Sequence, residues 1–564
     1  MSLLRFLASG APAPATNIED VFSAYTYTGS ASNQTFTTGV DLSTNGGMIW
    51  EKARSTTYAH QLVDSVRGFN KNLDSASTGS QSTDSPANFS ASTTGFTVTG
   101  ATIVNFAGQT HVGWTFRKAA KFFDVVTYTG NGANRTIAHS LGSVPGMIMV
   151  KRTDTTGAWK VYHRSLTSNA YYLVLNTTAA EASDATVWNS TTADASVFSL
   201  GTHADVNANA GTYVAYLFAH DTASTGLIQC GSYTTDAGGA ATINLGWEPQ
   251  FILHKTSSTA NSGWLIVDSM RGLTMGNDAY LAGNASDAEA SGGLIQPTAT
   301  GFINQLWASQ TLVYVAIRRG PMAQPTSGTQ VYGTYAKGSG ETINQISLSF
   351  LPDMMFAKNR SGGTASGFYF FDRLRGITPF LISSSTNAEA TAVPGKQFDP
   401  RMDGPVVGTG VGSNLEYNDS TNTSIFSFLR RYPGVFDEVC YTGTGSAHTE
   451  AHNLTVVPEL MIVKARVATT NSADWDVYSA PSGPTKVQWL NTTDAVAVQS
   501  THWNDTAPTN AVFTVGTNTR VNESAKTYVA YLFATKAGVS KVGSYTGNGT
   551  NQTINAGFSA GARF

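Results

Sequence analysis

The chain has 564 residues, of which 41% are hydrophobic and only 13% are charged. Its length predicts roughly three to five domains, and its apolar content suits packed cores and excludes wholesale disorder. The net charge of −3 leaves no basic surplus for a nucleic-acid partner, and no apolar run reaches the length of about 18 residues that a membrane-crossing helix needs. The 55 glycines, with many Thr, Ser and Asn residues, indicate short strands joined by turns.

Residues 1–20 open the chain with a short apolar peptide and a spacer of Pro and Ala. The peptide does not fit a secretory signal, because its apolar core is short and is interrupted by Arg5. We therefore expect this segment to dock into a partner protein.

The rest of the chain is a tandem repeat with a period near 100 residues. A start resembling Tyr-Thr-Gly recurs at Tyr27, Tyr128, Tyr233, Tyr335, Tyr441 and Tyr545. In the first five copies an apolar strand follows and ends at Lys52, Lys151, Lys255, Lys358 and Lys464. Later landmarks are an aromatic-led strand at 159–162, 264–268, 368–372 and 475–478, and a closing strand at 112–116, 213–218, 312–317, 424–429 and 528–533.

A repeat of this length is a whole domain, because it is too long for one unit of a solenoid. Short runs rich in Val, Ile, Tyr, Phe, Trp and Thr between turn residues are typical of a β-sandwich or jelly roll. The closing strands are apolar on both faces, which predicts a central position in the sheet. We predict an all-β chain divided into an N-terminal attachment segment (1–20), five sandwiches (21–123, 124–225, 226–326, 327–434 and 435–538) and a partial sixth (539–564).

The links between repeats are about ten residues long, and three of them hold aromatics or prolines. Such links predict stacked domains with little hinge freedom. The arginine pairs 318–319 and 430–431 are expected to be solvated charges at strand ends. Because half a sandwich would leave an unpaired edge, we also expect the natural chain to continue beyond Phe564.

The sequence contains little that suggests catalysis or metal binding. The segment 138–142 resembles a nucleophile elbow, but the fifth repeat has Asn453 where this one has Ser140. His448 and His452 would share a helix face, but in a strand they are about 13 Å apart. We predict no enzyme activity, no metal and no cofactor, and two buried free thiols, Cys230 and Cys440.

Two groups of residues could face a ligand. An Asp and an Arg three positions apart recur at Asp64–Arg67, Asp268–Arg271 and Asp372–Arg375, either as a pair that holds a turn or as a polar sugar site beside an aromatic ring. Tryptophans in two variable loops either stack on a glycan or close the sandwich. The candidate ligand-facing residues are Trp188, Trp503, Asp268 and Arg271.

Three phrases resemble repeats in virion proteins of tailed phages, especially marine ones. They are Phe-Asp-Val-Val-Thr-Tyr-Thr-Gly-Asn-Gly at 123–132, the segment 139–152 and Tyr-Val-Ala-Tyr-Leu-Phe at 213–218. The resemblance covers residues 21–564 and implies a virion location, an N-terminal attachment segment and oligomerisation, with a trimer suggested by likeness to fibres. It supplies no catalytic residues.

We therefore expect a phage tail fibre or similar appendage, with the sandwiches as its shaft. Its expected partners are other tail or neck proteins, through residues 1–20, and a host surface glycan or protein, with no nucleic acid and no membrane. The alternatives are a head or neck decoration protein, a glycan-binding or glycan-cleaving module, and a bacterial surface adhesin.

Overall fold

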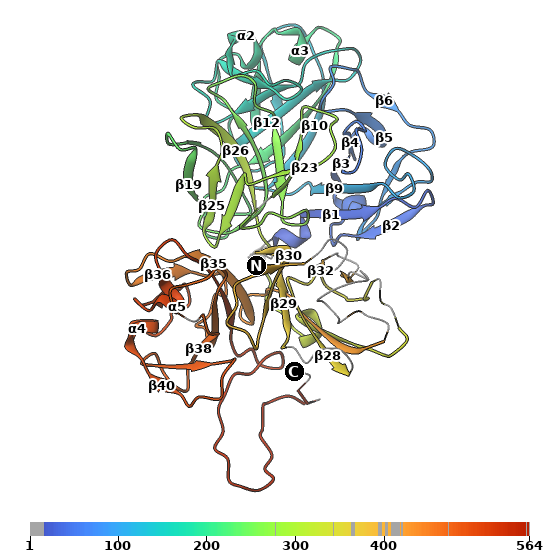
Figure 1. The fold of residues 1–564 in the computed structure, drawn as a ribbon. Coiled ribbons are helices and arrows are strands. Elements are labelled where there is room, and N and C mark those ends of the chain that lie inside the picture. Colours follow the sequence, from blue (N-terminus) through green and yellow to red (C-terminus); the bar gives the residue numbers. More distant parts are fainter. Residues whose placement is uncertain are drawn as a thin grey trace, which may run out of the picture.

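The protein consists of five consecutive β-sandwiches, as the computed structural model in Figure 1 shows. The structure describes residues 16–562 apart from positions 277, 342, 344, 362–366, 393–397, 401–403, 408–417, 419, 420, 472 and 560. Each predicted repeat range contains one six-stranded antiparallel sheet and one smaller sheet. Every helix in the described part is only three or four residues long, so the predicted all-β fold is confirmed.

In repeat 1 (21–123) the spatial order of strands defines the pattern for all five. The large sheet is β1 (Phe22–Thr28), β9 (Thr110–Arg117), β3 (Gly47–Ala53), β4 (Gln61–Asp64), β5 (Gly68–Leu73) and β6 (Ser82–Thr83); the small sheet is β2 (Gln34–Thr37), β8 (Gly95–Val98) and β7 (Phe89–Ala91). A short helix, η1 (Ile18–Asp20), comes just before this repeat, and another, α1 (Leu42–Asn45), lies within it.

Repeats 2 (124–225) and 3 (226–326) keep this order. In repeat 2 the large sheet is β10 (Phe123–Thr129), β17 (Thr212–Ala219), β12 (Pro145–Arg152), β13 (Lys160–His163), β14 (Tyr171–Val174) and β15 (Ala182–Ser183), the small sheet is β11 (Arg135–Ala138) and β16 (Val197–Leu200), and the helices are α2 (Ala185–Trp188) and α3 (Ala204–Asn207). In repeat 3 the large sheet is β18 (Ile228–Thr234), β26 (Thr311–Arg318), β20 (Pro249–Thr256), β21 (Leu265–Asp268), β22 (Asp278–Ala282) and β23 (Ala290–Gly292). The small sheet is β19 (Ala240–Asn244), β25 (Gly301–Gln305) and β24 (Ile295–Thr298).

Repeats 4 (327–434) and 5 (435–538) also keep it. In repeat 4 the large sheet is β27 (Tyr332–Lys337), β34 (Thr423–Leu429), β28 (Met354–Ser361), β29 (Tyr369–Asp372), β30 (Gly376–Ile382) and β31 (Ala390–Thr391), with β32 (Phe398–Asp399), β33 (Val406–Val407) and η2 (Gly328–Gln330). In repeat 5 it is β35 (Phe436–Thr442), β42 (Thr527–Phe533), β37 (Leu460–Ala465), β38 (Asp476–Ser479), β39 (Lys486–Trp489) and β40 (Ala497–Val498), with β36 (His448–Ala451), β41 (Val512–Val515), α4 (Ser500–Trp503) and α5 (Thr519–Asn522).

In repeats 1 and 3, the two faces of the large sheet pack into different cores. In β3, Ile49 belongs to the core between the two sheets of repeat 1, whereas Met48 and Trp50 belong to a core that repeats 1, 2 and 3 share. In β20, Ile252 and Phe251 divide in the same way. This burial on both sides explains why the closing strands β9, β17, β26, β34 and β42 are apolar on both faces, and each one lies inside its sheet as predicted.

The Tyr-Thr-Gly landmark ties the opening strand to the segment that precedes the closing strand. The tyrosine hydroxyl donates a hydrogen bond of 2.7–2.8 Å to a backbone carbonyl, from Tyr27 to Val104, from Tyr128 to Val206 and from Tyr441 to Val521. The glycine allows the facing backbone to approach closely, because a Cβ at Gly29, Gly130 or Gly443 would lie 2.2–2.3 Å from a carbonyl oxygen.

Both cysteines are free, as predicted, with Cys230 buried and Cys440 half-buried. In the described part of the chain, no helix has the length and apolar character needed to cross a membrane.

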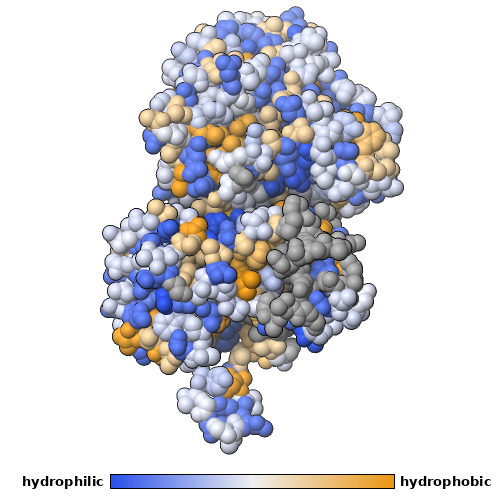
Figure 2. All heavy atoms as spheres, viewed as in Figure 1, coloured by the Kyte–Doolittle hydropathy of each residue, from blue (hydrophilic) through white to orange (hydrophobic). Residues whose placement is uncertain are grey.

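The sandwiches form two lobes (Figure 1). The first lobe comprises repeats 1, 2 and 3, and the second comprises repeats 4 and 5. Residues 541–562 lie outside any described strand and project from the second lobe, as the space-filling view in Figure 2 also shows. In the first lobe the sandwiches do not follow one another in a line, because repeat 3 returns to contact repeat 1.

The lobes meet at a buried group of charged side chains. Arg431 donates to Glu248 of repeat 3 at 2.7 Å, and Arg319 and Arg373 donate to Asp353 at 2.6 and 2.9 Å. Burial alone would raise the pKa of Asp353, but the three guanidinium groups outweigh this effect and hold its pKa below the usual range. Arg319 and Arg431 are therefore not the solvated strand-end charges that the sequence suggested.

Candidate functional site

Consecutive repeats contact each other through one recurring arrangement. The loop before the last strand of a large sheet, here called the linking loop, comprises residues 74–81, 175–181, 283–289 and 383–389 in repeats 1 to 4. The last residue of the linking loop donates its backbone N–H to a carbonyl of another repeat. The acceptor lies two positions after the lysine that ends the apolar strand of that repeat. These bonds measure 2.7–3.1 Å and run from Gln81 to Thr153, from Glu181 to Ser257, from Glu289 to Arg54 and from Glu389 to Arg466.

The aromatic-led strands supply a second bond at the same contact. The indole Nε1–H donates at 3.0 Å to a carbonyl at the first residue of the linking loop or just before it, from Trp159 to Asp74, from Trp264 to Val174 and from Trp475 to Ile382. In repeat 1 the equivalent residue is His60, whose Nε2 lies 3.0 Å from the carbonyls of Ala282 and Ala285. Burial lowers the pKa of His60 to about 3, so the ring is neutral and can still donate one proton.

Lysines at the ends of the apolar strands supply a third bond. Lys151, Lys255 and Lys464 donate from Nζ to the carbonyls of Thr78, Thr178 and Thr386 in the neighbouring linking loop, at 3.1–3.3 Å. All three lysines are 0% exposed, and burial lowers the pKa of each to about 8.

The Asp–Arg pairs predicted from the sequence lie at this contact as well. Asp268 and Arg271 are fully buried, 2.6 Å apart, and Asp268 also accepts the Nε1–H of Trp114 from repeat 1 at 2.9 Å. Asp64 and Asp372 accept instead from tyrosine hydroxyls of the next repeat, Tyr216 and Tyr531, both at 2.8 Å. In each pair the carboxylate also accepts backbone N–H groups of its own turn, which is the structural role given to these pairs by the first of the two sequence interpretations.

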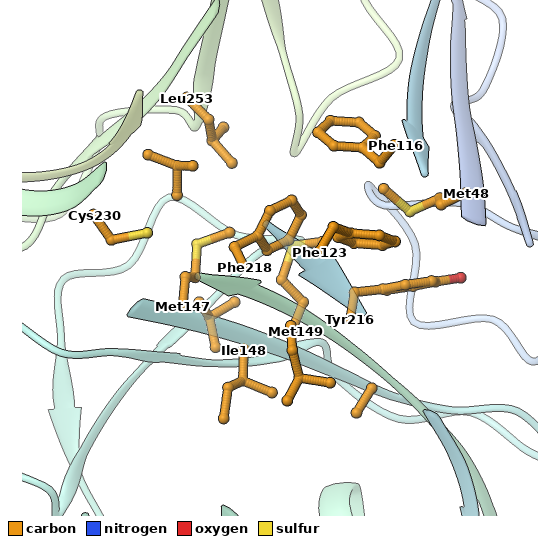
Figure 3. Close-up of a cluster of buried hydrophobic side chains, with 14 of the residues drawn as sticks. Met48, Phe116, Phe123, Met147, Ile148, Met149, Tyr216, Phe218, Cys230 and Leu253 are labelled. Carbon is orange, nitrogen blue, oxygen red and sulfur yellow. The ribbon is translucent and has the colours of Figure 1, made fainter. Parts of the chain in front are cut away.

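A shared apolar core fills the centre of the first lobe (Figure 3). The ring centroids of Phe116 lie 5.6 Å from Phe218 of repeat 2 and 6.0 Å from Phe251 of repeat 3, and Phe22 lies 5.4 Å from Phe251. Side chains from the large sheets of repeats 1, 2 and 3 therefore meet at one place.

The contacts of the first lobe close into a ring. Repeat 1 contacts repeat 2, repeat 2 contacts repeat 3 and repeat 3 contacts repeat 1, each time through the linking loop of the first and the lysine-ended strand of the second. A head-to-tail contact that closes after three steps corresponds to a rotation of about 120° per step. In the second lobe the same contact joins repeat 4 to repeat 5.

The two loop tryptophans lie in the cores of their sandwiches. Trp188 is 2% and Trp503 is 0% exposed, and each packs edge-on against a tyrosine, Tyr162 or Tyr478, at 6.0–6.1 Å. Neither ring face is open to a sugar in this structure, because both indoles close their sandwiches. Asp268 and Arg271 are likewise covered by the neighbouring repeat.

The motifs that resembled catalytic sites have structural explanations. The backbone N–H groups of Ser140 and of its counterpart Asn453 donate to Asp124 and Asp437 at 2.7 Å, so both residues occupy the same braced turn. His448 lies in strand β36 and contacts Glu450. Within the residues that the structure describes, no three His, Cys, Asp or Glu side chains are grouped to hold a metal ion.

The sequence analysis did not identify the contacts between repeats. The available signal was a side-chain N–H donor at the start of this strand in four of the five repeats, namely tryptophan in repeats 2, 3 and 5 and His60 in repeat 1. The acceptors are backbone carbonyls, which every residue has, so their positions cannot be recognised from residue types.

One family model matches most of the chain. It is described as Domain of unknown function (DUF7483), and it matches residues 18–305 and 432–560. Among curated proteins, none matches the chain.

Proposed function

The chain belongs to the DUF7483 family, and we propose that it is a structural protein of a phage virion, part of a tail fibre or a similar appendage that takes part in host attachment. The likeness of residues 123–132, 139–152 and 213–218 to virion repeats supports this assignment, as does the low charge of a chain built from rigid domains.

The observation that carries the proposal is the ring of three sandwiches. Fibres of phage particles have a three-fold cross-section when three chains associate, as the resemblance implied. Here three repeats of one chain close into a ring by themselves, so a thick and rigid cross-section needs no partner chain. Further copies would then associate through other surfaces.

The attachment role belongs to the start of the chain. Residues 1–15 of the predicted attachment segment lie outside the described residues. Ile18 is fully buried, and the Glu19 carboxylate accepts the backbone N–H groups of Met322 and Ala323 at 3.1–3.2 Å. Residues 16–20 are thus part of the folded body, and residues 1–15 are the segment that we assign to docking on the particle.

Deletion of residues 1–15 tests this assignment. We expect purified particles to lack the shortened chain, as measured by mass spectrometry of virion proteins, while the purified variant unfolds at the temperature of the full chain. Immunogold labelling of wild-type particles then distinguishes a tail appendage from a head or neck decoration. Normal incorporation of the deletion variant, or absence of the full chain from particles, would contradict the proposal.

A further inference from the structure

We propose that the open side of the second lobe binds one further sandwich of the same family, whose opening strand is formed by residues 540–546 of this chain. The argument rests on contacts between repeats and does not depend on the virion role. In the first lobe every repeat uses both halves of the recurring contact, its linking loop and its lysine-ended strand. In the second lobe, the described residues of repeat 4 form this contact through its linking loop alone, and those of repeat 5 through its lysine-ended strand alone.

The lysine-ended strand of repeat 4 is open where its counterparts are covered. Lys358 and Phe368 are half-buried, whereas the equivalent residues of repeat 1, Lys52 and His60, are 0% exposed. Arg360 is exposed at the position of Arg54, which forms a 2.7 Å ion pair with Glu289 of repeat 3. Lys358 and Arg360 are therefore the two cations that this contact uses to receive a linking loop with a terminal glutamate, while Phe368 keeps the aromatic ring without its N–H donor.

The linking loop of repeat 5 is likewise exposed. We call the space between this loop and the lysine-ended strand of repeat 4 the gap. Leu490 is 46% exposed, while its equivalents Leu175 and Ser75 are 0% exposed. Val496, the last residue of this loop (490–496), is 44% exposed. Three further apolar residues of repeat 5 at positions of the shared core are only half-buried: Leu460, Ile462 and Phe533.

The size of the gap is that of one sandwich. Repeat 4 and repeat 5 are related by the same contact as two neighbours in the first lobe, where the third step returns to the starting repeat. One more step from repeat 5 therefore leads to repeat 4. A second copy of the whole chain does not supply this piece, because its repeats 1, 2 and 3 are already closed and its repeats 4 and 5 carry the same gap.

Residues 540–562 have the sequence of an opening segment but not its environment. Tyr545 and Ile554 are 70% and 51% exposed, whereas their equivalents Tyr441 and Ile137 are 4% and 5% exposed. The bridge between Lys536 and Ser540 repeats the bridge between Tyr432 and Phe436 that introduces repeat 5. The backbone before residue 540 thus has the same bridge as the backbone before the first strand of repeat 5.

The test completes the sandwich on the full chain. By sequence Phe564 corresponds to Phe251, so residues 252–318 of repeat 3 are fused after Phe564. The readout is acetylation of Lys358 followed by mass spectrometry, with buried Lys464 as the internal reference. We expect Lys358 to react at least tenfold more slowly in the fusion than in the 564-residue chain. A matched fusion whose added segment carries the substitutions Trp264→Ala and Glu289→Ala should regain most of the reactivity.

Three results would overturn the inference. One is a fusion whose added sandwich unfolds cooperatively while Lys358 reacts as fast as before. Another is protection of Lys358 in the unmodified chain that grows with protein concentration, which would assign the surface to a second copy. If the added segment does not fold, residues 148–219 of repeat 2 replace it, and unchanged reactivity of Lys358 beside that folded segment counts equally against the proposal.

Discussion

Four buried lysines make the contact between repeats sensitive to pH, because their pKa values are lowered. Lys52, Lys151, Lys255 and Lys464 occupy one position of the repeat and are all 0% exposed. An ammonium group without water needs acceptors for its three protons, and these lysines find them mainly in backbone carbonyls. The carbonyls offset only part of the lost hydration, and burial accordingly lowers the pKa of each lysine to about 8.

The lysines predict a rise in stability in mildly alkaline solution. The ordinary lysine pKa of about 10.4 applies to the unfolded chain, so between pH 8 and pH 10 the unfolded chain binds protons that the folded chain has lost. The free energy of unfolding therefore increases with pH, by at most about 1.4 kcal/mol per pH unit for each lysine and by less after solvent screening. Chemical denaturation of the chain between pH 8 and pH 9.5 measures this slope.

A single substitution isolates the share of one lysine. Lys255→Met should give a smaller slope than the wild type, whatever its effect on absolute stability, because the substituted side chain no longer titrates. Lys541→Met, at an exposed position, should leave the slope unchanged. Equal slopes for the wild type and Lys255→Met would show that Lys255 titrates normally.

At the scale of single elements, the linking loops determine which repeats are neighbours. Each loop offers a backbone N–H and several carbonyls to another repeat, and two of the loops end in a glutamate that joins two arginines. Glu289 contacts Arg54 of repeat 1 and Arg271 of its own repeat, and Glu389 contacts Arg466 and Arg375 in the same way. The first of these glutamates closes the ring of the first lobe.

Replacement of this glutamate should loosen the ring at one contact. Glu289→Gln leaves the buried Arg271 guanidinium without one charged partner, and we expect a loss of about 1–3 kcal/mol from the unfolding free energy of the first lobe. Hydrogen exchange of residues 283–289 should become faster. Glu389→Gln is the matched control, since it should change the second lobe and leave exchange in residues 283–289 unaltered; an effect of either variant on both lobes alike would contradict this assignment.

The strands and turns could be predicted from the sequence, whereas the contacts between repeats could not. The segments ending at Lys52, Lys151, Lys255, Lys358 and Lys464 are all strands, and Asp268 and Arg271 do pair around a turn. These features depend on local periodicity and spacing, which a sequence displays. The ring depends on bonds such as that from Trp264 to the carbonyl of Val174, in which any residue type can be the acceptor. Trp188 is hard to assign for a similar reason, because an indole that closes a core and one that faces a loop surface look alike in sequence.

At the scale of the whole molecule, the three domains of the first lobe are joined by one shared core. The core shared by repeats 1, 2 and 3 contains residues from each large sheet, so a repeat without its two neighbours would expose an apolar sheet face. Between the lobes the chain passes through residues 319–331, which include the exposed Ala323 and Gln324.

Truncations at repeat boundaries should therefore behave very differently. A fragment of residues 1–326 contains the complete ring, and we expect a soluble protein with one cooperative calorimetric transition. A fragment of residues 1–225 lacks repeat 3, and we expect it to bind a hydrophobic dye, to aggregate, or both, because Phe22 and Phe116 lose their contacts with Phe251. Cooperative unfolding of residues 1–225 without dye binding would show that the sandwiches are independent.

The covalent order of the three repeats has a consequence for how the ring behaves in dilute solution. Three separate chains that form a ring dissociate when they are diluted below their dissociation constant. Here the links of about ten residues keep the members at a high effective concentration, whatever the amount of protein present. The ring formed by repeats 1, 2 and 3 therefore needs no other molecule to stay complete, even at extreme dilution.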